Sequence, residues 1–244
     1  MQRLFINSDQ LSGNKIVINE ETFHHLINVC RLKIGDSLEA VVDQEKILLL
    51  KVLNIENSNS ICIEIHDQWA VNPIRPYKIH LIQSLPKQDK FTEICRMCTE
   101  LGVNTISPIV SEYSSVNEIS ENKFKRAKNT ILSAAKQSKQ SSIPVLNSVN
   151  NLSDCLVQFS NTKYLKLIAY ENASQQLNQL EFAIPNDLVI AIGPEGGFSP
   201  GDMALFKQYG FYDFSLGSHI LRTEHAGFAS ICFFDGYIQS KNKS

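Results

Sequence analysis

The sequence predicts an α/β protein in which a small β-rich domain precedes a larger domain built on a parallel sheet. Short apolar runs of strand length, separated by turn residues, occupy roughly the first 70 residues. After them, apolar strands alternate with helices, which is typical of a parallel sheet covered on both faces. Two prolines in four residues, Pro73 and Pro76, favour an extended linker between the two parts. We therefore expect domains at residues 1–72 and 73–244.

Hydrophobic periodicity predicts the individual strands and helices of each part. In the first part, strands are predicted at 15–18, 38–42, 47–53 and 61–65 and a helix at 21–29, which together suggest a small barrel. In the second part, strands are predicted at 77–85, 105–110, 164–170 and 188–192, and helices at 89–101, 121–140 and 224–238. Gly102 is placed to end the first of these helices, and Ser199 before Pro200 is placed to begin another that Gly210 closes.

Composition limits the classes of function. Hydrophobic residues make up 43% of the 244 residues and charged residues 20%, as in an ordinary globular protein. No run approaches the ~18 apolar residues of a membrane helix, and residues 1–7 become polar too soon for a signal peptide. We expect a cytoplasmic protein with no membrane partner. The net charge of −2 does not indicate a nucleic-acid binder, and the basic segment 123–139 is either a solvated helix face or a phosphate contact.

The six cysteines do not predict a metal site or a disulfide framework. Cys95 and Cys98 form a C-x-x-C, but no second Cys or His pair stands at similar spacing, as a zinc site would require. Their spacing puts both thiols on one helix face. We expect buried, reduced thiols that pack in the core, and no metal.

Two glycine-containing stretches are candidates for a binding site. Residues 190–199 read as a buried strand, a glycine-rich turn and a capped helix start, where free N–H groups and glycines let a backbone approach a ligand. Residues 216–226 place Arg222 and Glu224 beside a glycine turn at a helix entrance. Each stretch alone is equally explained by a tight turn or by a surface ion pair with a capping threonine.

Together, these stretches resemble the RsmE family of 16S ribosomal RNA (uridine-N3) methyltransferases, in the SPOUT superfamily. Five segments match that family's motifs in the same order along the chain, at 24–36, 99–103, 135–144, 193–197 and 216–226. The resemblance therefore spans essentially the whole chain. It implies an N-terminal PUA-like RNA-binding barrel and a C-terminal SPOUT domain with a trefoil knot, an exception to the rule that chains are unknotted.

The resemblance also implies the ligands and their residues. S-adenosyl-L-methionine (SAM) would be the cofactor, and the small ribosomal subunit with its 16S rRNA would be the partner of a homodimer. The cofactor-binding residues would be Ile192, Gly193, Pro194, Glu195, Gly196, Gly197, Leu216, Gly217, Ile220 and Leu221. The RNA-binding residues would be His24, His25, Arg31 and Lys33. The chain has no G-x-G-x-x-G motif, so a Rossmann-type cofactor site has no support.

The implied reaction assigns roles to two residues. Uridine N3 is a poor nucleophile until it loses its proton, so the site needs a proton acceptor or cations that stabilise a uridine anion. Arg222 is the candidate for polarising the base or contacting its phosphate. Glu224 is the candidate for orienting Arg222 or accepting the proton.

The match departs from the family where the family has arginine. Tyr113, Gln140 and His219 stand at or near such positions, and neither Tyr nor Gln replaces the planar guanidinium fork. A diverged RNA- or ribosome-binding SPOUT protein with a lost or altered methylation target therefore remains an alternative. A second alternative is a nucleotide-dependent oxidoreductase, but the sequence has neither the dinucleotide fingerprint nor a P-loop lysine that this function would require.

Overall fold

The computed structural model describes residues 2–56, 59–160, 162–173, 175 and 187–241. The chain divides into two compact units. The N-terminal unit comprises residues 1–74 together with 135–142, and the C-terminal unit comprises residues 75–134 and 143–244. No helix in the described residues has the length and apolar character needed to cross a membrane.

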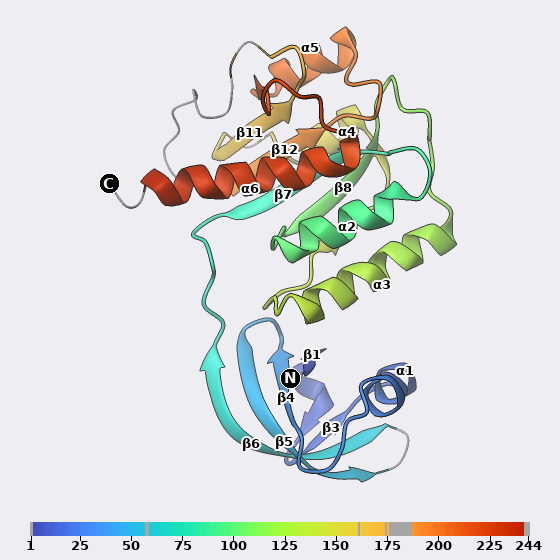
Figure 1. The fold of residues 1–244 in the computed structure, drawn as a ribbon, viewed down its shortest axis with the longest axis vertical. Coiled ribbons are helices and arrows are strands. Elements are labelled where there is room, and N and C mark those ends of the chain that lie inside the picture. The colour runs from blue at the N-terminus through green and yellow to red at the C-terminus, as the bar shows by residue number, and fades with distance from the viewer. Residues whose placement is uncertain (1, 57–58, 161, 174, 176–186, 242–244) are drawn as a thin grey trace. The chain divides into compact units, whose positions relative to one another are not determined.

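The N-terminal unit is a curled six-stranded sheet, which confirms the expected β-rich module (Figure 1). Its strands are β1 (Gln2–Ile6), β2 (Leu11–Ser12), β3 (Lys15–Val17), β4 (Ser37–Val42), β5 (Lys46–Glu56) and β6 (Ser60–Ala70). They pair in the order β1-β4-β5-β6-β3-β2, and only β1 and β4 run parallel. Ile61, Ile63 and Ile65 of β6 alternate with Cys62 and Glu64, a pattern that predicts one buried face. Ile61 and Ile63 are buried accordingly, whereas Ile65 is 44% exposed.

The segment 135–142 belongs to this unit because of Arg3. The Arg3 guanidinium is buried, lies 2.7 Å from Oε2 of Glu39, and donates hydrogen bonds to the main-chain carbonyls of Lys139 and Gln140. A buried charge is tolerated only when it is paired and hydrogen-bonded in this way. Gln140 is itself buried, so its main chain has a structural role in this unit.

The C-terminal unit is built on a seven-stranded sheet in which every pair of strands is parallel, as predicted. The strands are β7 (Lys78–Ser84), β8 (Thr105–Val110), β9 (Val145–Leu146), β10 (Asn150–Asn151), β11 (Tyr164–Ala169), β12 (Asp187–Ile192) and β13 (Tyr212–Phe214). The order is β10-β8-β7-β12-β11-β13, with β9 also paired to β8. The winding direction therefore reverses between β7 and β12. In open parallel sheets, ligands bind at the carboxyl ends of the strands near such a reversal.

Helices cover both faces of this sheet (Figure 1). Leu188, Ile190 and Ile192 of β12 pack into the core under α2 (Lys90–Glu100), α3 (Glu121–Gln137) and α6 (Thr223–Lys241). Val189 and Ala191 of the same strand pack into the core under α4 (Leu152–Val157) and α5 (Pro200–Gln208). Because successive side chains of a strand point to opposite faces, a continuous apolar run indicates burial on both sides.

The predicted helix ends are confirmed at three positions. Gly102 has a φ of +72° and its N–H donates to the carbonyl of Thr99, while Val103 N donates to Cys98 O, so that α2 ends in a Schellman motif. The Ser199 side chain accepts from Asp202 N at 3.0 Å, and Asp202 accepts from Ser199 N at 3.1 Å, which caps α5. Gly210, with a φ of +77°, closes α5.

The cysteine pair of α2 is part of the core, as predicted. Cys95 and Cys98 are 0% and 1% exposed. Burial raises the pKa of the Cys98 thiol to about 12, so the thiol stays protonated and inert.

Several elements differ from the predictions. Strands β1 and β13 were not predicted, and β6 continues to Ala70, so the extended linker begins at Val71. The helix predicted at 21–29 is an α-helix over Glu20–His24 followed by a π-helical segment over His25–Val29. Helix α3 ends at Gln137 instead of Gln140. The differences in β6 and α3 lie at element ends, where capping and pairing partners decide the boundary, whereas β1 and β13 are whole strands that the sequence did not indicate.

Candidate functional site

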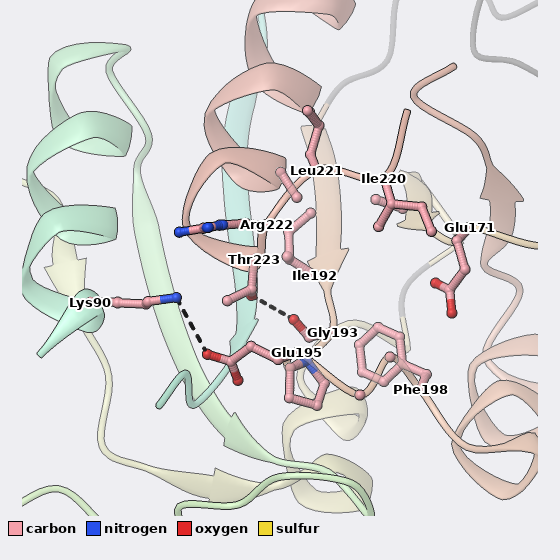
Figure 2. A pocket seen from close by; sticks show the side chains of 15 residues that line it. Lys90, Glu171, Ile192, Gly193, Glu195, Phe198, Ile220, Leu221, Arg222 and Thr223 are labelled. Carbon is pink, nitrogen blue, oxygen red and sulfur yellow. Dashed lines mark hydrogen bonds and ion pairs between the residues drawn. The ribbon is translucent and has the colours of Figure 1, made fainter. Parts of the chain in front are cut away.

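Two adjoining cavities open at the carboxyl ends of the strands of the C-terminal unit. The larger, of about 400 Å³, lies beside the loop that follows β12 (Figure 2). It is lined by residues 192–198 and 220–223 with Lys90, Ala169, Glu171 and Ala226. The smaller, of about 290 Å³, is lined by residues 169–171 and 215–221 with Ala226. The larger cavity alone lies within the ~300–1,000 Å³ range of small-molecule sites.

The loop after β12 exposes its backbone because it is rich in glycine. Gly197 has a φ of +71°, a conformation that L side chains rarely adopt, and its N–H donates to Pro194 O at 3.0 Å. A Cβ on Gly193 would lie 3.3 Å from the carbonyl carbon of Gly197, and one on Gly196 would lie 3.3 Å from Cβ of Tyr113. The loop thus forms a tight cradle in which side chains would fill the space beside the backbone.

Thr223 joins this loop to the start of α6. Its hydroxyl donates to Gly193 O at 2.6 Å (Figure 2). The same hydroxyl accepts from Nε2 of Gln83 at 3.0 Å. Gln83 is fully buried at the end of β7, and its Oε1 has no partner among the described residues. The chain of hydrogen bonds therefore holds β7, the glycine loop and α6 in one arrangement.

Lys90 lies between two carboxylates at the other end of the larger cavity. Its ammonium nitrogen is 3.1 Å from Oε1 of Glu224 and 3.8 Å from Oε1 of Glu195. Glu195 also accepts from the main-chain N–H of Lys87 at 3.0 Å. The glycine loop, the start of α2 and the first turn of α6 are therefore linked through charged groups, and Figure 2 shows the Lys90–Glu195 pair among them.

The environment of Glu224 keeps it ionised. Burial alone would raise the pKa of this carboxyl, but hydrogen bonds from its own backbone N–H and from Lys90 outweigh burial and hold the pKa below its ordinary value. A carboxylate of lowered pKa is a weak base. Glu224 pairs with Lys90, and among the described residues no hydrogen bond or ion pair joins it to Arg222.

Arg222 is the free cation of the site. Its side chain lines the larger cavity and makes no hydrogen bond or ion pair within the part of the chain that the structure describes. Its main-chain carbonyl accepts from His225 N and Ala226 N at the start of α6. The main chain of Arg222 is thus fixed while its guanidinium stays available to a ligand.

The structure brings most of the sequence-predicted residues together. Residues 192–197, 220 and 221 and Arg222 line the larger cavity, and Leu216 and Gly217 line the smaller one. Glu224 lies behind the wall, against Lys90. His24, His25, Arg31 and Lys33 are exposed on the N-terminal unit and line neither cavity, and Arg31 has a left-handed φ of +55°.

The three positions that depart from the family differ in their surroundings. His219 lines the smaller cavity. Tyr113 is half exposed and lies against Gly196 of the glycine loop. Gln140 is buried in the N-terminal unit. Two of the three therefore lie at or beside the site.

The sequence did not indicate several residues of the site, among them Lys90, Glu171 and Gln83. None of them belongs to a glycine-rich motif. The available signal was position: Glu171 follows β11 by two residues, Gln83 lies at the end of β7, and Lys90 begins the helix after β7. In a parallel sheet these are the positions that face a ligand. Among the described residues, no group of three His, Cys, Asp or Glu side chains could hold a metal ion.

Comparison with protein families gives two matches along the chain. Residues 73–234 match the RNA methyltransferase domain, and residues 18–65 match the RNA methyltransferase PUA domain. The chain is 32% identical to ribosomal RNA small subunit methyltransferase E of Buchnera aphidicola, over 94% of this chain and 93% of that protein. It is 31% identical to the protein of the same name from Mesomycoplasma hyopneumoniae, over 93% of this chain and 95% of that one.

Solved structures show the same fold. A methyltransferase structure from Legionella pneumophila, in complex with SAM, is 26% identical, has a TM-score of 0.84, and covers 96% of each chain. Ribosomal RNA small subunit methyltransferase E of Neisseria gonorrhoeae, bound to SAM, has a TM-score of 0.86 at 24% identity over 97% of each chain. The architecture therefore extends over both units of the chain.

Proposed function

The chain belongs to the RNA methyltransferase family of ribosomal RNA small subunit methyltransferase E, and from this premise we infer that it is a SAM-dependent methyltransferase of 16S rRNA. We propose that its target atom is N3 of a uridine in the small ribosomal subunit, and that it acts in the cytoplasm. The observation that carries the proposal is the convergence of the glycine loop and the 220–223 segment on one cavity.

The residues present fit the cofactor. The glycine loop keeps its main chain exposed beside the cavity, because Gly197 has a left-handed φ and a Cβ on Gly193 or Gly196 would crowd Gly197 or Tyr113. The apolar side chains of Ile192, Ile220 and Leu221 provide an apolar wall beside exposed main-chain groups. When bound, SAM supplies an activated methyl group for transfer. The glycine loop and residues 216–221 would hold it.

We propose that the cations of the site stabilise the target base. Uridine N3 becomes nucleophilic as its proton leaves to solvent water in the open cavity, and negative charge then develops on the base. The unpaired guanidinium of Arg222 faces the cavity and can stabilise that charge, with the ammonium of Lys90 on the same wall. Glu224 and Glu195 fix the ammonium of Lys90. Glu224 therefore acts as a positioning residue, since its lowered pKa disfavours proton uptake.

The N-terminal unit is proposed to bind RNA. The PUA match covers residues 18–65, and the exposed side chains of His24, His25, Arg31 and Lys33 lie within it. Arginine and lysine at exposed positions contact phosphates, and histidine stacks on bases. We propose domains at 1–72 and 73–244, with the first for RNA and the second for methyl transfer. A trefoil knot in the second domain stays a prediction.

A homodimer is proposed from the exposed face of α6. Phe228 and Phe233 are 37% and 44% exposed, Cys232 is exposed beside them, and a Cβ on Gly236 would meet nothing within 4 Å. An exposed apolar helix face of this kind marks an interaction site. In a dimer with two-fold symmetry, the same face of a second copy would pack against it and bury these side chains. The preceding residues Ile220 and Leu221 belong to the cavity wall, so the partner would lie beside the cofactor cavity.

Methyl transfer to small ribosomal subunits that lack the modification tests the function. We expect incorporation of labelled methyl groups into 16S rRNA, and a reverse-transcriptase stop at one uridine, because N3 lies on the pairing edge of the base. Binding of S-adenosylhomocysteine without incorporation would favour the RNA-binding protein without turnover. Absence of both would contradict the proposed function.

A further inference from the structure

The two cavities share part of their lining, and we call this shared part the waist. Five residues line both of them: Ala169, Glu171, Ile220, Leu221 and Ala226. Glu171 is the only one of the five with a charged or polar side chain, and Figure 2 shows it in the wall of the larger cavity. A ligand that fills both cavities therefore lies against a lining whose polar member is Glu171.

The side chain of Glu171 is exposed at the cavity wall and has no partner among the described residues. It follows β11 at the carboxyl edge of the sheet, and a Cβ on Gly197 would lie only 2.9 Å from its Oε1. No hydrogen bond or ion pair of this side chain is present in the described part of the chain. The other carboxylate in the cavity wall, that of Glu195, already accepts from Lys87 N and lies near Lys90. Of the two carboxylates that line the larger cavity in the described residues, Glu171 is thus the one without a partner.

We propose that Glu171 accepts hydrogen bonds from the ribose hydroxyls of the cofactor, an inference that rests on the proposed function. SAM is an elongated molecule whose ribose lies between adenine and the methionine portion. A cofactor that extends through both cavities brings its middle, the ribose, to the waist. A vicinal diol has two donors, and an ionised carboxylate has two oxygens that accept, which is a matched and charge-assisted pairing.

Gly197 lies beside this carboxylate. A methyl group at this position would lie 2.9 Å from Oε1 of Glu171, so the end of the Glu171 side chain would have to move. The glycine therefore has two functions, since it permits the left-handed turn and leaves space for Glu171 at the waist.

Calorimetric titration with S-adenosylhomocysteine and its 2′-deoxyribose and 3′-deoxyribose analogues tests the proposal. We expect Glu171→Ala to weaken binding of S-adenosylhomocysteine on the order of 10- to 100-fold, and Glu171→Gln to weaken it less. Wild-type protein should bind at least one deoxy analogue more weakly than S-adenosylhomocysteine. In Glu171→Ala that difference should disappear, because the hydroxyl has lost its acceptor. Glu118→Gln, a matched change in a separate cavity of the same unit, should leave all affinities unchanged.

The possible outcomes distinguish failure of the Glu171 proposal from failure of the proposed methyltransferase function. Wild-type protein that binds S-adenosylhomocysteine while both Glu171 variants bind it equally well would overturn the role of Glu171 alone. A Glu171→Ala variant that loses affinity for S-adenosylhomocysteine but not for 5′-methylthioadenosine would also overturn it, because the carboxylate would then contact the amino group. Wild-type protein that binds none of these compounds would overturn the proposed function as well. The deoxy comparison in wild-type protein remains decisive if the alanine variant fails to fold.

Discussion

The ammonium nitrogen of Lys90 lies 3.1 Å from Oε1 and 3.2 Å from Oε2 of Glu224, so one lysine engages both oxygens of a buried carboxylate. Lys90 begins α2 and Glu224 lies in the first turn of α6, 134 residues later in the chain. The Lys90 side chain is 25% exposed and lines the cavity, whereas the Glu224 side chain is 9% exposed. The pair therefore presents its cationic member to a ligand and keeps its anionic member in the wall.

Lys90→Met should slow methyl transfer by about 100-fold, comparable to the loss of one charge-stabilising donor in an active site. Affinity for S-adenosylhomocysteine should change little. Lys87→Met is the matched control, because Lys87 contributes to the site only through its main-chain N–H. Single-turnover rates and calorimetry on both variants measure these effects.

Removing Lys90 also leaves the buried carboxylate of Glu224 without its partner. An unpaired buried charge destabilises a protein even where the ion pair itself contributes little to stability. The double variant Lys90→Met/Glu224→Gln separates the two effects. It should recover thermal stability but not the rate. A double variant that recovers the rate would show that Lys90 acts only through folding.

Glu224 should make the stability of the protein depend on pH in the acid range. Its pKa is lowered in the folded protein, so the unfolded chain binds the proton more readily. The stabilising contribution is therefore complete above the ordinary carboxyl pKa of 4.5 and is lost as the pH falls through the lower folded value. The difference in Tm between wild-type protein and Glu224→Gln should shrink between about pH 6 and pH 3. A difference that grows on acidification would contradict the assignment.

Arg222→Ala should abolish measurable methylation while affinity for S-adenosylhomocysteine stays close to that of wild-type protein. The guanidinium has no partner among the described residues, so its removal should cost little stability. The expected loss in rate is at least about 100-fold, and Arg222→Lys should restore part of it because charge returns without the planar fork. Unchanged turnover in Arg222→Ala would remove this residue from the mechanism.

Gly197→Ala and Gly210→Ala should differ although both glycines have a left-handed φ, of +71° and +77°. Each substitution carries the backbone cost of about 1–2 kcal/mol. A Cβ on Gly210 would meet nothing within 4 Å, whereas one on Gly197 would lie 2.9 Å from Oε1 of Glu171. Only Gly197→Ala should therefore lose affinity for S-adenosylhomocysteine. Thermal unfolding and calorimetry of both variants make the comparison, and equal affinity in both would contradict it.

Local signals predicted the parts of the fold that local physics decides. Gly102 and Ser199 were predicted as helix ends because an αL glycine and a capping hydroxyl act within one turn of the chain. Strand β1 was missed because it exists through pairing with β4, about 36 residues away. Strand β13 has only three residues, too few for an apolar pattern.

The residues of the site show the same distinction between local sequence signals and contacts between distant segments. The glycine loop and Arg222 belong to segments with a recognisable pattern, so the sequence pointed to them. Lys90 and Glu171 are single charged residues in separate parts of the chain, and they become part of a site only when β7, β11 and β12 align their carboxyl ends. The role of Glu224 also depended on a partner that the sequence does not place near it.

Phe228→Lys and Phe233→Lys should each convert the proposed homodimer to a monomer. Both side chains are exposed on α6, and a charge in an apolar interface must be desolvated without a partner. Val157→Lys is the matched control, because Val157 is 59% exposed on α4, a helix on the other face of the sheet. Sedimentation velocity at several protein concentrations should show a dimer for wild-type protein and Val157→Lys and a monomer for the two phenylalanine variants. A monomeric wild-type protein, or phenylalanine variants that remain dimeric, would mean that α6 does not form the interface, and the cofactor cavity would then be complete within a single chain.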